Sequence, residues 1–381
     1  MYSIIRAAST VLLVWVAMLS TVAHAKSTAV NTYQVSSPNG RLVVDLNIDA
    51  GIYYSATLGD NTLLTNAMAD ITIKGQKGIS RSNVIDVSRQ RVNRQLTPHV
   101  KQKSALIAEQ YHELTLTFDN AQKVSFRVFD QGFAYRFTTN KTGEVIVLDE
   151  QANLRFNQDH ALLFPEETSF VSHNERLYLA KKLSDITKEQ FASLPLLVDT
   201  GTAKLVITES GLKEYPGMWL AGTSSDSNSG RPQFGLNAIF PQHVLKAIAK
   251  DGSDRNERIV KRGEFLAKNQ ITKEAGGRQF PWRIFAVSEQ DAQLLTNQLS
   301  YLLADEVAID PSWVKPGKVA WDWWNAMNLY DVDFETGLNT ATWMHYIDFA
   351  ADNGIEYVIL DEGWSYTTTD LTKANPDLDL P

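Results

Sequence analysis

Two short stretches near the C-terminal end of the sequence combine acids with tryptophan. They are Asp-Trp-Trp-Asn at residues 322–325 and Asp-Glu-Gly-Trp at residues 361–364. A carboxylate accepts hydrogen bonds from sugar hydroxyls, and an indole ring packs well against the apolar face of a sugar. These stretches therefore indicate carbohydrate binding. The alternative is structural, since acids after a strand also form turns and cap the next helix.

Each stretch belongs to the end of a predicted strand. Residues 319–325 and 355–364 are largely apolar strands, and residues 339–354 between them have the polar start and C-terminal glycine of a helix. Such a strand–helix–strand unit predicts a parallel sheet that is covered on both faces. In barrels of alternating strands and helices, active sites lie at the C-terminal ends of the strands. Both stretches therefore fall where a barrel places its active site.

Strand geometry limits what these residues can do together. Side chains next to each other along a strand point to opposite faces. We therefore expect only one of Trp323 and Trp324 to line a pocket. For the same reason we do not expect Asp361 and Glu362 to act as an opposed acid and base. Asp361 is predicted to bind substrate hydroxyls or to support the site, and no catalytic residue is assigned within this chain.

The preceding part of the chain has the pattern of antiparallel strands. Many short segments, such as residues 40–49 and 111–119, alternate apolar and polar residues between turn-forming residues. So many half-buried strands predict a large two-sheet sandwich. Residues 288–305 follow as one predicted linker helix, with Ser288 as its N-cap and leucines along one side.

These patterns divide the chain into four segments. We expect a signal peptide at residues 1–25, a sandwich domain at 26–287, a linker helix and connection at 288–317, and the first two strand–helix units of a (β/α)8 barrel at 318–381. An eight-unit barrel needs ~200–250 residues. Two parallel strands alone also leave sheet edges unpaired. We therefore expect the sequence to be an incomplete piece of a longer protein.

The first residues and the composition indicate an exported protein. Arg6 precedes a short apolar core at about residues 11–19, and Ala-His-Ala at residues 23–25 is typical of a cleavage site. The sequence contains no cysteine, so we expect neither disulfides nor an N-terminal lipid. The net charge of −8 disfavours a nucleic-acid partner. We expect a periplasmic or secreted protein without a membrane anchor after cleavage, as a monomer or a weak dimer.

Six segments taken together resemble glycoside hydrolase family 97. They lie at residues 163–178, 191–201, 207–220, 281–288, 319–325 and 357–364. The resemblance implies a galactose-mutarotase-like sandwich followed by a catalytic (β/α)8 barrel. It also implies a calcium-dependent, exo-acting α-glycoside hydrolase that acts on oligosaccharides. An α-glucosidase is our first expectation and an α-galactosidase the second, and the general acid and its partner carboxylate are expected on later barrel strands.

The resemblance also suggests a calcium ligand in the sandwich. The matching residue is Glu175, and Glu209 is a competing candidate. A glutamate suits this role because calcium takes about 6–8 oxygen ligands. The alternative for Glu175 is a solvated acid that pairs with Arg176 or Lys181.

The substrate-binding residues that the resemblance implies come from both regions. Pro195 and Leu196 match a sandwich loop that helps to wall the sugar site, although the residues alone indicate the start of a buried strand. Trp323 and Trp324 match the aromatic residues of the family's pocket.

Two other functions stay open at this point. A non-catalytic carbohydrate-binding sandwich explains the tryptophans and the export, but it leaves the strand–helix–strand unit without a purpose. A structural or chaperone-binding sandwich predicts no pocket between the two regions. The truncated chain itself is expected to be inactive.

Overall fold

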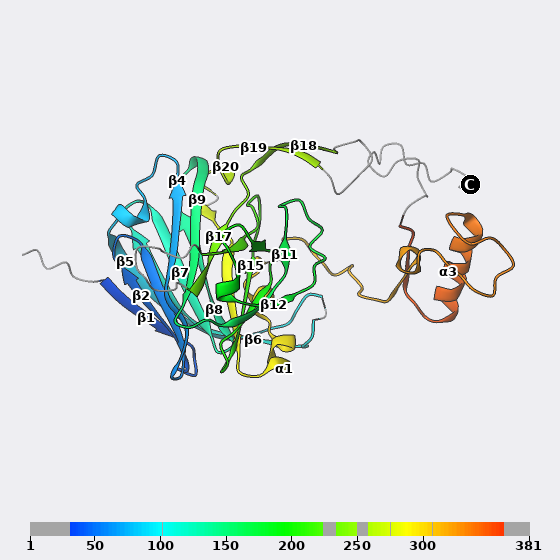
Figure 1. The fold of residues 1–381 in the computed structure, drawn as a ribbon, viewed down its shortest axis with the longest axis horizontal. Helices are drawn as coiled ribbons and strands as arrows, with labels where there is room; N and C mark the ends of the chain where they lie inside the picture. Colours follow the sequence, from blue (N-terminus) through cyan, green and yellow to red (C-terminus); the bar gives the residue numbers. More distant parts are fainter. Residues whose placement is uncertain are drawn as a thin grey trace, which may run out of the picture.

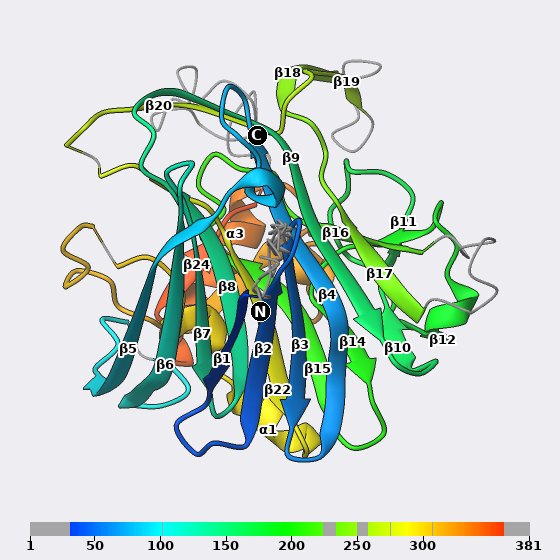
Figure 2. The same cartoon turned by 90° about the vertical axis from the view of Figure 1, so that its left-hand side faces the viewer.

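Two ten-stranded antiparallel sheets form most of the computed structural model (Figures 1 and 2). The structure describes residues 31–100, 102–223, 234–249, 258–274, 276–306 and 308–361. The expected signal peptide and residues Glu362 and Trp364 lie outside the described residues. No helix in the described part of the chain has the length and apolar character needed to cross a membrane.

The first sheet begins with four consecutive strands and continues through β9, which pairs with β4 on one side and β17 on the other. In spatial order its strands are β1 (Asn31–Ser36), β2 (Leu42–Ile48), β3 (Ile52–Leu58), β4 (Asn61–Ile73), β9 (Gly143–Phe156), β17 (Phe234–Ile239), β16 (Trp219–Gly222), β13 (Phe191–Ala192) and β11 (Glu166–Glu167), with β20 (Ala267–Ile271) also paired to β9.

The second sheet lies against the first, as Figure 2 shows for β1–β4 in front of β8, β15 and β22. In spatial order its strands are β12 (Leu179–Lys182), β10 (Ala161–Phe164), β14 (Leu196–Asp199), β15 (Lys204–Ser210), β22 (Trp282–Ser288), β8 (Gly132–Thr139), β7 (Gln122–Phe129), β6 (Ile107–Phe118) and β5 (Val84–Leu96), with β21 (Arg278–Gln279) also paired to β8. A separate hairpin joins β18 (Val244–Ala249) to β19 (Arg258–Arg262), and two 3-10 turns are η1 (Ile79–Arg81) and η2 (Leu183–Asp185). The predicted two-sheet sandwich is therefore confirmed.

Aromatic side chains fill the space between the two sheets. Tyr54 of the first sheet contacts Phe126, Phe133, Tyr135 and Phe285 of the second, at ring-centroid distances of 5.6 to 6.2 Å. All five rings are almost completely buried. The alternation of apolar residues along each strand directs these rings inward, and burial of each ring contributes roughly 1.5–3 kcal/mol.

The predicted single helix at residues 288–305 is wrong. Two short helices, α1 (Asp291–Thr296) and α2 (Leu299–Leu302), occupy this segment, and Ser288 is the last residue of β22 rather than an N-cap. Asn297 separates the helices because its side chain donates to the Gln131 carbonyl and accepts from the Leu299 N–H. This contact with the sandwich holds the residue between the two helices in place.

A parallel strand pair follows the linker. The strands β23 (Val319–Trp321) and β24 (Tyr357–Ile359) pair in parallel, and α3 (Thr340–Asp352) connects them. Asn339 caps the helix by accepting a hydrogen bond from the Thr342 N–H. The strand–helix–strand prediction is confirmed. Figure 1 shows this unit at the end of the connection, to the side of the sandwich.

Candidate carbohydrate site

The tryptophans after β23 lie in a 3-10 turn, η3 (Asp322–Asn325), and not on the strand that the sequence predicted. The expectation that Trp323 and Trp324 face opposite ways is therefore wrong. Both indoles stack on Trp321, at centroid distances of 5.2 Å and 6.2 Å. Trp323 is 49% exposed and Trp324 78% exposed. The turn thus presents two indoles to solvent on one surface.

A buried carboxylate explains why the strand ends early. Asp322 is fully buried, and its Oδ2 accepts a hydrogen bond of 2.9 Å from Trp343 Nε1 on α3. Its Oδ1 accepts a 3.2 Å hydrogen bond from the backbone N–H of Asp361, just beyond β24. Asp322 therefore ties the ends of both strands to the helix. The sequence placed this acid at a strand end but gave it no such positioning role.

Asp361 follows β24 at the same end of the parallel pair. Its backbone is held by Asp322, whereas its exposed side chain makes no hydrogen bond or ion pair with a described residue. Asn325 lies in the neighbouring turn, where its Oδ1 accepts from the Tyr346 hydroxyl and its Nδ2 donates to the Asn328 carbonyl at 2.6 Å. The predicted residues Trp323, Trp324 and Asp361 are thus gathered by one set of contacts.

A second group of predicted residues lies in the sandwich, on the loop between β11 and β12. Glu167 is buried and accepts hydrogen bonds of 2.8 Å from Ser172 Oγ and from Arg176 Nε. Glu166 accepts 2.6 Å from Lys181 Nζ and 2.8 Å from Gln190 Nε2. These bonds hold both ends of the loop and pair its Arg176 with Glu167 and the adjoining Lys181 with Glu166.

Glu175 is left without a lysine or arginine partner among the described residues. Its side chain is 81% exposed, and its carboxylate lies 3.5 Å from His173 Nδ1. The alternative that Glu175 pairs with Arg176 or Lys181 is not what the structure contains, because those cations bind Glu167 and Glu166. Glu175 therefore offers an open carboxylate on a fixed loop.

The β14 segment lies beside this loop. The Tyr178 hydroxyl donates a 3.1 Å hydrogen bond to the Pro195 carbonyl, which joins the Glu175 loop to the start of β14. Pro195 is exposed, whereas the Leu196 side chain is fully buried in the sandwich core. Leu196 thus occupies the buried strand start that the residues alone indicate.

Glu209, the competing calcium candidate, is already saturated. Both of its carboxylate oxygens accept from the Met218 N–H, at 3.0 and 3.1 Å, and Oε2 also accepts from Arg283. Burial raises the pKa of Glu209 to about 7, although Arg283 acts in the opposite direction. A buried carboxyl with these partners is a poor metal ligand, because hard cations need ionised oxygens that are free to coordinate.

The two groups of predicted residues remain separate. Between described residues, no hydrogen bond or ion pair connects the sandwich to residues 310–361. The described residues also contain no cluster of three or more histidines, aspartates or glutamates suited to a metal ion. The exposed indoles can stack on a sugar ring, and the Asp361 carboxylate can accept hydrogen bonds from its hydroxyls. Glu175 can supply one oxygen ligand to a calcium ion.

Comparison with known proteins places both regions in one protein family. The N-terminal region of glycosyl hydrolase 97 matches residues 35–305, and glycoside hydrolase 97 matches residues 323–381. A retaining alpha-galactosidase of Bacteroides thetaiotaomicron is 35% identical over 361 residues, which cover 91% of this chain and 53% of that protein. The chain thus spans about half the length of this relative.

Solved structures share the fold. A glycoside hydrolase family 97 enzyme from Pseudoalteromonas sp. strain K8, in complex with acarbose, has a TM-score of 0.69 and 21% identity. A variant of an enzyme of that family from the same source, in complex with panose, also has a TM-score of 0.69 and 21% identity. Each match covers 89% of this chain and 48% of the other chain.

Proposed function

Because the chain belongs to glycoside hydrolase family 97, we propose that it forms part of a retaining α-galactosidase that removes terminal α-linked galactose from oligosaccharides. The observation that carries this proposal is the 35% identity to a retaining alpha-galactosidase across 91% of the chain. The sequence alone favoured α-glucosides over α-galactosides, and this relative reverses our order of preference. The acarbose and panose complexes belong to enzymes only 21% identical, so they support the fold and not the choice of sugar.

The described residues would bind and orient the substrate. Trp323 and Trp324 offer indole faces to a sugar ring, and Asp361 offers a carboxylate to its hydroxyls. Asp322 positions these groups from inside the fold. Retaining cleavage requires two carboxyl groups about 5–5.5 Å apart, one as acid and base and the other as nucleophile. We assign neither role to a residue of this chain, and we propose that both lie on later strands of a (β/α)8 barrel that begins with β23 and β24.

We also propose a calcium ion at the site, with Glu175 as one ligand. The test of fit is the state of the carboxylate, which is exposed and has no lysine or arginine partner among the described residues. Its oxygens are the hard donors that calcium prefers. When bound, calcium would act as a Lewis acid or orient the scissile bond. Glu175 alone cannot hold the ion, so further oxygen ligands would come from the barrel.

Export to the periplasm or the cell exterior completes the proposal. It rests on the cationic start, apolar core and Ala-His-Ala ending of residues 1–25. An extracellular site suits an enzyme that meets oligosaccharides before they enter the cell. The measurement is the N-terminal sequence of the protein recovered from the periplasm, which should begin at Lys26.

The decisive experiment uses the full-length protein with aryl α-galactoside and aryl α-glucoside. We expect faster hydrolysis of the galactoside, and we expect NMR to show that the first product has the α-anomeric configuration. Faster hydrolysis of the glucoside would overturn the choice of sugar. A β-anomeric first product would overturn retention. Sugar binding without any hydrolysis would favour the non-catalytic carbohydrate-binding function instead.

A further inference from the structure

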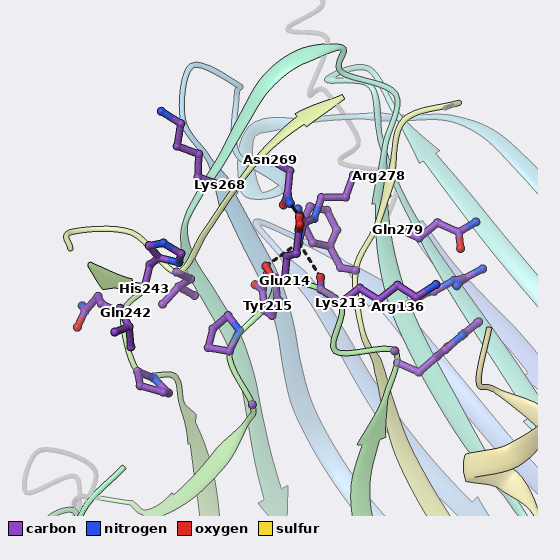
Figure 3. Close-up of a pocket in the computed structure, with 18 of the residues that line it drawn as sticks. Arg136, Lys213, Glu214, Tyr215, Gln242, His243, Lys268, Asn269, Arg278 and Gln279 are labelled. Atoms are coloured by element: carbon purple, nitrogen blue, oxygen red, sulfur yellow. Dashed lines mark hydrogen bonds between the residues drawn. The ribbon is translucent and has the colours of Figure 1, made fainter. Parts of the chain in front are cut away.

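A broad groove crosses the sandwich on the side of β8, β20 and β21 (Figure 3). It has a volume of about 1410 Å³, and the loop at residues 211–217 forms part of its lining. The half-buried aromatic residues Phe170 and Trp219 also line it, with their rings 5.5 Å apart. None of these residues belongs to the sites predicted from the sequence.

Arginine dominates the charge of this groove. Arg136, Arg262 and Arg278 all line it, and none of the three forms an ion pair with a described carboxylate. The two acids in the lining bind other groups of the groove directly, since Asp305 pairs with Lys213 at 2.8 Å and Glu214 accepts from Asn269. Through space, Asp305 also acts on Arg136 and Glu214 on Arg278. The chain as a whole has 44 acidic and 36 basic residues, so this excess of cations is a local feature.

The arginines are held in place by rings and backbone carbonyls. The Arg136 guanidinium lies 4.4 Å from the centre of the Trp282 ring. Arg262 lies 5.8 Å from the Phe170 ring and donates to the Gln242 carbonyl. These contacts orient the guanidinium groups without neutralising them, because neither a π face nor a carbonyl carries a full negative charge.

Arg278 is the most constrained of the three. Only 7% of the residue is exposed, and its Nε is buried without a hydrogen-bond partner. Its Nη2 donates to the carbonyls of Lys213 and Glu214. Burial lowers the pKa of Arg278, and burial together with Arg127 lowers the pKa of Arg136 to about 10. Burial of a cation is unfavourable, and an anion bound beside it would offset that cost.

We propose that this groove binds an acidic oligosaccharide, whose carboxylate or sulfate groups are recognised by Arg136, Arg262 and Arg278. Guanidinium groups bind such oxyanions through paired N–H donors, and several cations along one groove suit a ligand with more than one charge. Trp219 provides an indole face for a sugar ring in the same groove. The anionic character follows from the groove itself, whereas the carbohydrate character rests on the proposed function.

The test is isothermal titration calorimetry on the full-length protein. The probes are trigalacturonic acid, a sulfated galactan oligosaccharide and a neutral galactose trisaccharide. We expect at least one acidic probe to bind more tightly than the neutral one, with an affinity that falls as NaCl is raised. Binding to the carboxylated or to the sulfated probe identifies the anion. Binding to neither, or equal binding of the neutral sugar, would overturn the proposal.

Matched variants locate the binding. Arg136→Met and Arg262→Met should each weaken binding of the acidic probe roughly tenfold or more, because a charge-assisted hydrogen bond is lost. Arg91→Met makes the same change on the exposed strand β5, outside the groove, and should leave the affinity unchanged. Equal affinities for Arg136→Met, Arg262→Met and Arg91→Met would sink the assignment. Unfolding midpoints check that each variant is folded.

The result is independent of catalysis. Hydrolysis of a neutral aryl α-galactoside without binding of either acidic probe would refute the groove proposal alone. Binding of an acidic probe by a protein that hydrolyses no glycoside would refute the proposed function alone.

Discussion

The substitution Glu209→Gln should change how the stability of the sandwich depends on pH. Arg283 is fully buried between the sheets, where its guanidinium binds Glu150 of β9 at 2.7 and 2.8 Å and Glu209 of β15. Two carboxyl groups thus share one buried cation. Burial raises the pKa of Glu209 from its ordinary value of 4.5 to about 7, and the neighbouring Glu150 adds to the rise.

The sign and size follow from that pKa. Between pH 4.5 and 7 the folded protein keeps a proton on Glu209, whereas the unfolded chain has released it. Stability from this group is therefore fully present below pH 4.5 and is lost as the pH rises to 7. A difference of about 2.5 pKa units corresponds to roughly 3 kcal/mol, since each unit is worth 1.36 kcal/mol.

The assay is urea unfolding of the wild type and the Glu209→Gln variant at pH 5 and pH 8, followed by tryptophan fluorescence. Trp282 on β22 is buried and lies on the same strand as Arg283, so it reports on this region. We expect the wild type to lose about 2.5 kcal/mol relative to the variant between the two pH values, because part of the loss has already occurred at pH 5. Glu189→Gln is the control, because a hydrogen bond from Thr187 lowers the pKa of that exposed acid and gives the opposite sign. An unchanged difference between wild type and Glu209→Gln at the two pH values would refute the reasoning.

Three further predictions concern the residues of the candidate site. Asp322→Asn should destabilise the β23–α3–β24 unit by about 1–3 kcal/mol, because the new amide can accept only one of the two N–H donors that Asp322 binds, as measured by urea unfolding. Glu175→Gln in the full-length protein should weaken calcium binding at least tenfold in calorimetry, and an unchanged affinity would remove Glu175 from the ligand set. Trp324→Ala should raise KM for an aryl α-galactoside about threefold to tenfold. Because Trp324 is 78% exposed, the unfolding midpoint should change little. A lower midpoint with an unchanged KM would indicate a structural role instead.

The sandwich was predictable from sequence because the alternation of apolar and polar residues along a strand shows which face the strand buries. The same pattern does not report the partner of a strand. β9 pairs with β4 and β17, and the latter lies far along the chain, so the order of the first sheet depends on contacts between distant residues. The break between α1 and α2 has a similar cause. The Asn297 side chain donates a hydrogen bond to the carbonyl of Gln131, which is 166 residues away. A local helical pattern cannot indicate so distant a contact.

The turn after β23 escaped prediction for a related reason. The apolar residues on both sides of Asp322 continue a strand pattern, so the acid looked like the last polar position of a strand end. Its two partners, Trp343 and Asp361, lie 21 and 39 residues further along the chain. Once both N–H donors are supplied, the carboxylate can be buried, and the backbone turns to keep it there. The indoles therefore point to one surface.

The loop before β12 shows how the structure separates acids that look alike in sequence. Glu166, Glu167 and Glu175 lie within ten residues, beside two cations that could neutralise any of them. The sequence left pairing of Glu175 with Arg176 or Lys181 open as the alternative to a calcium-ligand role. The burial of Glu167 decides otherwise, because a buried carboxylate costs far more to leave unpaired than an exposed one. Arg176 therefore satisfies Glu167, and the negative charge that stays open on this loop is that of Glu175.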